Sequence, residues 1–136
     1  MLLDTNPVVA VLDEEPTAPK VRAVLRAARA LGVQLVVSPL TLAELLSKPG
    51  LSAAERRRRE DFCLSTEGIE FGTVWFEAAF ARQVARHRRE AYPQKMPDCM
   101  QYAFADALGC DAILSNDAKF VSACPKRGIL VDEIDS

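Results

Sequence analysis

Apolar residues along the chain alternate between short continuous runs and longer stretches with helical spacing. These runs, nearly continuous at 33–37, predict strands at residues 1–3, 33–37, 112–114 and 129–131, and Ile69 to Phe71 is a further candidate for a short strand. Helices are predicted over residues 20–31, 53–64, 75–92, 98–108 and 118–123, and another begins at Ser38-Pro39 and ends before Pro49. Because parallel neighbours need crossover connections, this alternation predicts an α/β protein, a three-layer α/β/α sandwich with a mostly parallel central sheet.

The segment Asp4-Thr5-Asn6-Pro7 ends the first run and is interpreted as a strand terminator, so no helix is predicted before residue 20. The phenylalanines and Trp75 are spaced like core residues or residues of a dimer face, so we expect them to pack. Val24, Leu25 and Leu42 are further candidates for a dimer face.

Composition narrows the class of protein. Apolar residues make up 49% and charged residues 26% of the 136 residues, as in an ordinary globular protein, and we expect one domain over residues 1–136. No apolar run approaches the roughly 20 residues that cross a membrane, and no leader segment is recognised, so we expect a cytoplasmic protein. The net charge of −2 gives no overall attraction to nucleic acid, so RNA binding would need a local basic face or bound cations.

The cysteines show no C-x-x-C pair, and we expect reduced thiols that mostly fill the core and no zinc site. They are Cys63, Cys99, Cys110 and Cys124.

Four acidic residues occupy positions where functional groups of a parallel sheet gather. Asp4 and Asp117 each follow a predicted strand, so they project from the same edge of the sheet. Glu44 lies in the first turns of the helix after the second strand, and Asp98 begins the helix before the strand that leads to Asp117. We therefore expect four carboxylates to converge at this edge.

Grouped carboxylates repel one another and need a cation, and ligation by oxygen alone favours Mg²⁺ or Mn²⁺ over zinc. Such an ion activates water and stabilises charge on a phosphate oxygen, so hydrolysis of phosphodiester bonds is the reaction we expect. Thr5 and Asn6 are candidate helpers near the ion or the phosphate. Ser115 and Asn116 could bind a carboxylate or the substrate.

The motifs Leu2-Leu3-Asp4-Thr5-Asn6, Ser38-Pro39-Leu40-Thr41-Leu42-Ala43-Glu44-Leu45, Pro97-Asp98 and Ser115-Asn116-Asp117 resemble those of PIN-domain nucleases, in family order and over nearly the whole chain. Within that family the resemblance is to VapC-type toxins of type II toxin–antitoxin pairs. It implies a PIN-like fold, dependence on Mg²⁺ or Mn²⁺, an RNA substrate, an antitoxin partner and a homodimer. It also implies that Asp4, Glu44, Asp98 and Asp117 bind the metal and that Thr5 or Asn6 is the polar helper.

Arginine-rich stretches fit either a solvated helix surface or a surface that binds RNA or an acidic partner. From residues 56–59 and 82–89 we select Arg56, Arg57 and Arg86 as candidate substrate-binding residues. His87 is the sole histidine, and we expect it to be an exposed structural residue rather than a catalytic one.

Three other functions stay open on the sequence. The chain could be an RNA-processing nuclease outside a toxin–antitoxin pair, or an interaction module that uses its acidic crevice to bind a partner without catalysis. A phosphatase with an aspartate nucleophile is disfavoured, because such a site wants a second aspartate two positions after the first and that position holds Asn6.

Overall fold

The central sheet of the computed structural model, which describes residues 1–135, contains five parallel strands in the order β3-β2-β1-β4-β5. Leu2 pairs in register with Val36 of one neighbouring strand and with Ile113 of the other. The strands are β1 (Leu2–Leu3), β2 (Leu35–Val37), β3 (Ile69–Phe71), β4 (Ala112–Ser115) and β5 (Arg127–Leu130). The predicted sheet is confirmed, and every strand pair in it is parallel.

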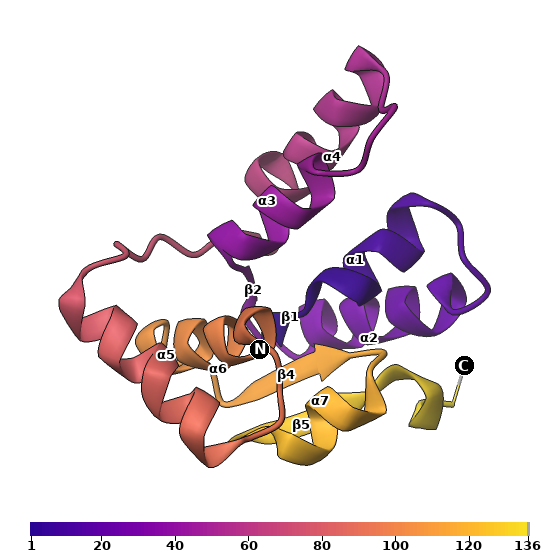
Figure 1. The fold of residues 1–136 in the computed structure, drawn as a ribbon. Coiled ribbons are helices and arrows are strands. Elements are labelled where there is room, and N and C mark those ends of the chain that lie inside the picture. The colour runs from indigo at the N-terminus through magenta and orange to yellow at the C-terminus, as the bar shows by residue number, and fades with distance from the viewer. Residues whose placement is uncertain (136) are drawn as a thin grey trace.

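Helices cover both faces of the sheet, and α3 and α4 extend away from it as an arm (Figure 1). Leu3, Val37 and Leu114 pack into one core cluster with residues of α1 and α2, whereas Leu2 and Ile113 pack with residues of α6 and α7 on the other face. The helices are α1 (Thr5–Leu12), α2 (Ala18–Ala30), α3 (Pro39–Leu46), α4 (Ala53–Ser65), α5 (Ala78–Glu90), α6 (Met96–Ala107), α7 (Ala118–Ala123) and the 3-10 helix η1 (Val131–Glu133). Alternate strand residues thus serve two cores, which confirms the three-layer α/β/α sandwich.

The prediction that no helix precedes residue 20 is wrong, because α1 begins at Thr5. Asp4 caps this helix by accepting a hydrogen bond from the Thr5 backbone amide at 2.9 Å. Pro7 is tolerated because the first amides of a helix have no partner within it. The tetrapeptide interpreted as a strand terminator therefore also starts a helix.

The segment before α5 also differs from the prediction. The helix begins at Ala78 and not at Trp75, and the Trp75 side chain is 80% exposed. Phe76 is exposed as well, although its ring contacts that of Phe80 edge to face with centroids 5.2 Å apart. Trp75 is therefore not a core residue of this chain, and its place on a dimer face stays a prediction, whereas Phe80, Phe104 and Phe120 are buried as expected.

One arginine of the 56–59 run is not a surface residue. Arg59 is 2% exposed, and its guanidinium donates to Asp13 Oδ1 at 2.7 Å. This ion pair joins α4 to the residue that caps the end of α1, and Lys48 lies 3.4 Å from the other Asp13 oxygen. Although burial opposes the effect, the hydrogen bond and charge of Arg59 hold the pKa of Asp13 below its ordinary value. The arm is therefore fixed to the body by a largely buried salt bridge.

His87 is also buried, at 2% exposure, so the prediction of an exposed histidine is wrong. It lies in α5, and its Nε2 is 2.6 Å from Asp106 Oδ2 in α6. Gln83 donates to the same oxygen at 2.9 Å, and Lys126 lies 3.2 Å from Oδ1. A histidine can be buried here because a carboxylate on the neighbouring helix supplies its hydrogen-bond partner.

These contacts predict an acid-dependent loss of stability. Burial would raise the pKa of Asp106, but hydrogen bonds from His87, Gln83 and Lys126 outweigh it and lower that pKa. A carboxyl with a lower pKa in the folded state stabilises the fold above about pH 4, and this stabilisation is lost as the pH falls. We expect Asp106→Asn to lose less stability than wild type between about pH 5 and pH 3 in urea unfolding. Equal losses in the two proteins would contradict the prediction.

The cysteines are free thiols, as expected, and Cys63, Cys99 and Cys110 are buried. Burial raises the pKa of the Cys63 thiol to about 11. None of the helices within residues 1–135 has both the length and the apolar character to cross a membrane.

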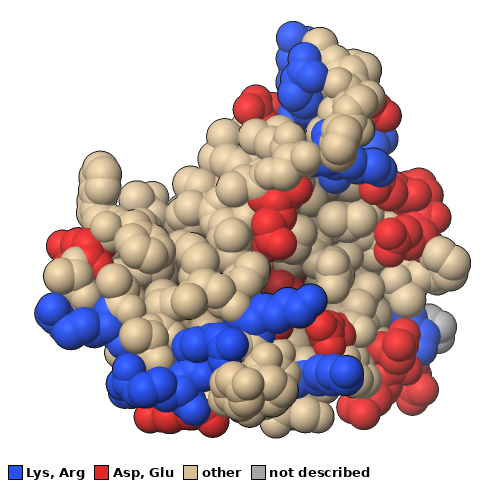
Figure 2. Space-filling view, viewed as in Figure 1, with Lys and Arg blue, Asp and Glu red and all other residues tan. Residues whose placement is uncertain are grey.

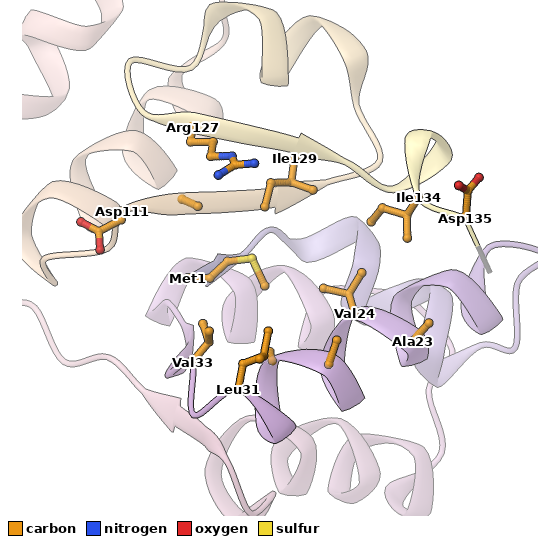
Figure 3. Close-up of a pocket in the computed structure, with 13 residues that line it drawn as sticks. Met1, Ala23, Val24, Leu31, Val33, Asp111, Arg127, Ile129, Ile134 and Asp135 are labelled. Atoms are coloured by element: carbon orange, nitrogen blue, oxygen red, sulfur yellow. The ribbon is translucent and has the colours of Figure 1, made fainter.

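An apolar groove of about 750 Å³ lies along α2 and β5 (Figure 3). Its wall includes Val24 of α2, Leu31 directly after that helix, and Ile129 of β5. Met1 and Asp111, which precede strands β1 and β4, also line it, so it lies toward the amino-terminal edge of the sheet.

Candidate active site

Strand order reverses between β1 and β4, because the chain runs from β1 to β2 and β3 on one side and returns to β4 and β5 on the other. Such a switch point at the carboxyl edge of a parallel sheet is where ligands bind. Asp4 follows β1 directly, and its amide donates to the carbonyl of Leu114 in β4 at 2.9 Å. Asp117 comes two residues after β4. Both aspartates therefore lie at this point, as the sequence predicts.

Asp4 is buried and held by donors on both oxygens. It is 9% exposed, Oδ2 accepts from Ser115 Oγ at 2.7 Å, and Oδ1 accepts from Gln101 Nε2 at 3.3 Å as well as from the Thr5 amide. Burial raises the pKa of Asp4 although these hydrogen bonds oppose it, and the charge of Asp117 raises that pKa further. The geometry fixes the carboxyl, and its surroundings favour a nearby positive charge.

Asp98 lies in the first turn of α6 and is half-buried. Burial is the main reason that the pKa of its carboxyl is raised, followed by the charges of Asp4 and Asp117 and, more weakly, of Glu44. Hydrogen bonds place the other three acids together: Ser115 bonds both Asp4 and the Asp117 amide, and Thr5, whose amide bonds Asp4, donates to Glu44. The four acids predicted from the sequence thus share one region of the molecule, and Figure 2 shows acidic atoms in a hollow below the α3–α4 arm.

The other two acids are partly engaged by neighbours. Glu44 Oε1 accepts from Thr5 Oγ1 at 2.8 Å. Asp117 Oδ1 accepts from the amides of Lys119 and Phe120, at 2.9 and 3.2 Å, and so caps α7. Asp117 therefore has a structural role, which does not conflict with a second role for its other oxygen.

A family model of the PIN domain matches residues 1–124. This chain belongs to the PIN domain family. PIN domains are generally nucleases, so the chain has the fold and family of a hydrolase that acts on nucleic acids.

Solved structures share this PIN fold over nearly their full length. FitAcB from Neisseria gonorrhoeae is 17% identical, with a TM-score of 0.69, over 98% of this chain and 99% of that one. VapBC2 from Rickettsia felis, bound to a DNA fragment from its promoter, is 17% identical, with a TM-score of 0.70, over 95% and 96% of the chains. FitAB bound to an IR36 DNA fragment is 18% identical, with a TM-score of 0.69, over 99% and 97%. No curated protein matches the chain in sequence.

The polar residues proposed as helpers of this PIN site differ in their surroundings. Thr5 is buried, whereas Asn6 is exposed on the first turn of α1. Ser115 Oγ donates to Asp4 and accepts from the Asp117 amide at 3.0 Å, so it bridges two of the acids. Asn116 donates weakly to Thr17 Oγ1 at 3.4 Å, and its buried Oδ1 has no partner within residues 1–135.

The three candidate substrate-binding arginines are not brought to the acids. Arg56 and Arg57 lie in the first turns of α4, which is part of the arm, and Arg56 donates to the Leu51 carbonyl at 2.7 Å. Arg86 lies in α5, 3.7 Å from a carboxylate oxygen of Asp106. The contacts of Arg56 and Arg86 are structural, and a role of these arginines in RNA binding stays a prediction.

Gln101 belongs to this region of the PIN domain but was not selected from the sequence. It is 2% exposed, it lies three residues after Asp98 on α6, and it contacts Asp4. In the sequence, Gln101 is a polar residue beside the apolar positions of the predicted helix 98–108. Polar residues at such positions are common on the solvent-exposed face of a helix, so the pattern does not mark Gln101 as buried.

The donor set fits a hard divalent cation by its chemistry, because carboxylate oxygens are the ligands that Mg²⁺ and Mn²⁺ prefer. Within residues 1–135, however, no three acidic, histidine or cysteine side chains are placed to hold one ion together. Mg²⁺ keeps several waters and needs direct bonds from only one or two carboxylates. Burial and the neighbouring acids raise the pKa values of Asp4 and Asp98, so a cation bound among these carboxyls would favour their ionised forms.

Proposed function

We propose that the chain is a divalent-metal-dependent endoribonuclease that hydrolyses RNA phosphodiester bonds. The observation that supports this best is the group of acids at the switch point of the sheet, where Asp4 and Asp117 flank β1 and β4. Asp98 and Glu44 complete the proposed set of metal-binding residues, because the charges of Asp4, Asp117 and Glu44 all act on the Asp98 carboxyl. Mg²⁺ or Mn²⁺ is the proposed cofactor.

The chain's own residues supply orientation. When bound, the ion would lower the pKa of a coordinated water and offset charge on the phosphate. Ser115 holds Asp4 and the backbone of Asp117 at the same hydroxyl, and Thr5 holds Glu44, so the carboxylates are oriented before substrate arrives. Asn6, exposed at the start of α1, is the proposed polar contact to the phosphate.

The biological setting proposed is that of a VapC-type toxin. Support comes from the motif resemblance and from the shared fold of the VapBC2 and FitAB structures, which are toxin–antitoxin complexes. On the same grounds we propose an antitoxin partner, a homodimer, a cytoplasmic location and a single domain over residues 1–136. An RNA-processing nuclease without an antitoxin, and a non-catalytic interaction module, are the alternatives that the experiment below distinguishes.

Metal dependence is the direct test. Purified protein free of any antitoxin is incubated with tRNA, rRNA and mRNA fragments in Mg²⁺, in Mn²⁺ or in EDTA, with single-stranded DNA of matching sequence as the control. We expect cleavage of RNA in either metal, loss of cleavage in EDTA, and recovery when excess Mg²⁺ is added.

Other outcomes would contradict parts of the proposed function. Cleavage that persists in EDTA would remove the metal mechanism, and cleavage of the DNA alone would remove the proposed substrate class. If no substrate in the panel is cut while a partner protein still binds the chain, the non-catalytic alternative is favoured. A gene for a short DNA-binding protein next to this one would favour the toxin over a stand-alone processing enzyme.

A further inference from the structure

The amide group of Gln101 makes three hydrogen bonds in the interior of the molecule, which occupy both of its N–H groups and its carbonyl oxygen. Its Nε2 donates to Asp4 Oδ1 at 3.3 Å and to Thr41 Oγ1 at 3.0 Å. Its Oε1 accepts from Ser38 Oγ at 2.7 Å. A buried glutamine whose two N–H groups and carbonyl are all paired can adopt only one orientation of its amide.

The contacts continue from Thr41 to a second acid, and their direction follows from the number of protons. Thr5 Oγ1 donates its single proton to Glu44 Oε1 at 2.8 Å. Thr5 and Thr41 hydroxyls lie 3.2 Å apart, so the proton between them must come from Thr41. Thr41 in turn accepts from Gln101. The result is one directed chain of hydrogen bonds from Gln101 to Glu44, with a second branch from Gln101 to Asp4.

We propose that Gln101 is a positioning residue that orients Asp4 and Glu44 relative to each other. This inference rests on the proposed function insofar as it gives these acids a metal to bind. Asp4 directly precedes α1, Glu44 lies in α3 and Gln101 lies in α6. The hydrogen-bond chain therefore joins three parts of the fold that carry proposed metal-binding acids. Neutral donors hold the two carboxylates in place without adding a charge that would compete with a cation, and hydrogen bonds in such buried networks strengthen one another.

The first test needs neither metal nor RNA. In nuclear magnetic resonance spectra of the metal-free protein, the Gln101 side-chain amide is identified by its absence in Gln101→Met. We expect Glu44→Gln to shift both Gln101 amide protons, because the change is carried through Thr5 and Thr41. Glu60→Gln, an exposed acid in α4, is the control that leaves the signals in place.

Two substitutions at Thr41 distinguish an effect carried by the hydrogen bonds from an effect of altered packing. Thr41→Ser keeps the hydroxyl, and Glu44→Gln should still shift the Gln101 amide in that background. Thr41→Val keeps the volume and removes the hydroxyl, and the effect of Glu44→Gln on Gln101 should then disappear. Gln101 signals that do not respond to Glu44→Gln in the wild-type background would overturn the inference.

A second measurement addresses the role of the chain in metal binding. Titration of Mn²⁺ into the metal-free protein is expected to show affinity about 10- to 100-fold weaker in Gln101→Met than in wild type. Leu35→Val, which leaves a cavity at the start of β2, at the opposite edge of the sheet from the acids, controls for lost stability and should bind Mn²⁺ as wild type does. Equal affinity in Gln101→Met and wild type would overturn the positioning role.

The failures of the two proposals can be told apart. Wild-type protein that binds no Mn²⁺ refutes the proposed metal site, whereas the response of Gln101 to Glu44→Gln still decides whether the chain orients both acids. If wild-type protein binds Mn²⁺ but Gln101 does not respond to Glu44→Gln, only the proposed positioning role of the hydrogen-bond chain is refuted.

Discussion

Asp98→Asn is expected to lower the rate of metal-dependent RNA cleavage at least about 1,000-fold, which corresponds to about 4 kcal/mol of transition-state stabilisation. Asparagine keeps the size of the side chain but lacks the negative charge that the proposed site offers to a cation. Asp98 is half-buried and its carboxyl feels the charges of Asp4 and Asp117, so its loss removes one of the proposed metal-binding residues.

The same substitution should not destabilise the metal-free protein. Burial and, after it, the charges of Asp4 and Asp117 raise the pKa of the Asp98 carboxyl, so asparagine removes a charge that the folded state disfavours. We expect the free energy of unfolding of the variant to equal or exceed that of wild type in EDTA. Adding Mn²⁺ should then raise the Tm of wild type and leave that of the variant nearly unchanged, because only a state that binds the ion gains stability from it.

Single-turnover cleavage assays and thermal unfolding measure these two effects. Asp111→Asn is the matched control, since Asp111 is an exposed acid that precedes β4 at the opposite edge of the sheet. An Asp98→Asn protein that is folded and cleaves RNA at the wild-type rate would refute the proposed role of this carboxylate.

The second large effect is on stability and concerns the salt bridge between Asp13 and Arg59. Asp13→Ala is expected to lower the free energy of unfolding by about 3 kcal/mol, because it leaves the buried Arg59 guanidinium without its counter-charge. Arg59 already has one buried nitrogen, Nε, without a partner within residues 1–135, so the site has little capacity to absorb the loss.

Replacing the other partner of the salt bridge should lower the free energy of unfolding by less. Arg59→Met leaves Asp13, which is partly exposed and lies 3.4 Å from Lys48, so we expect a loss of about 1 kcal/mol. Arg58→Ala, at the exposed neighbouring position, should change stability by no more than about 0.5 kcal/mol. Urea unfolding of the three variants tests the order, and equal losses in Asp13→Ala and Arg59→Met would contradict it.

Much of the fold follows from local sequence because strands buried on both faces are continuously apolar. The strand at 69–71 and the helix at 118–123 have the predicted bounds. The ends of other helices differ from the predicted ends by a few residues, because capping rather than apolar spacing decides where a helix begins and ends. The omission of α1 has the same cause, since Asp4 and Pro7 are compatible with both a turn and a helix start.

Burial of polar side chains could not be predicted in the same way. Arg59, His87 and Gln101 look like surface residues in one dimension, and each is buried because a distant residue supplies its partner. For the site, the chemical type and sheet position of the acids were readable from the sequence. The hydrogen bonds that orient them were not, because they join residues up to 111 positions apart.

The pairing of β1 with both β2 and β4 has a consequence for synthesis of the protein. Leu2 of β1 cannot pair with β4 until Ile113 has been translated, and Asp117 is translated only after that. A polypeptide still growing on the ribosome therefore holds Asp4 and Glu44 without the two later aspartates. The four acids can therefore come together only after Asp117 has been made, so the proposed cleavage site is incomplete in any shorter nascent chain.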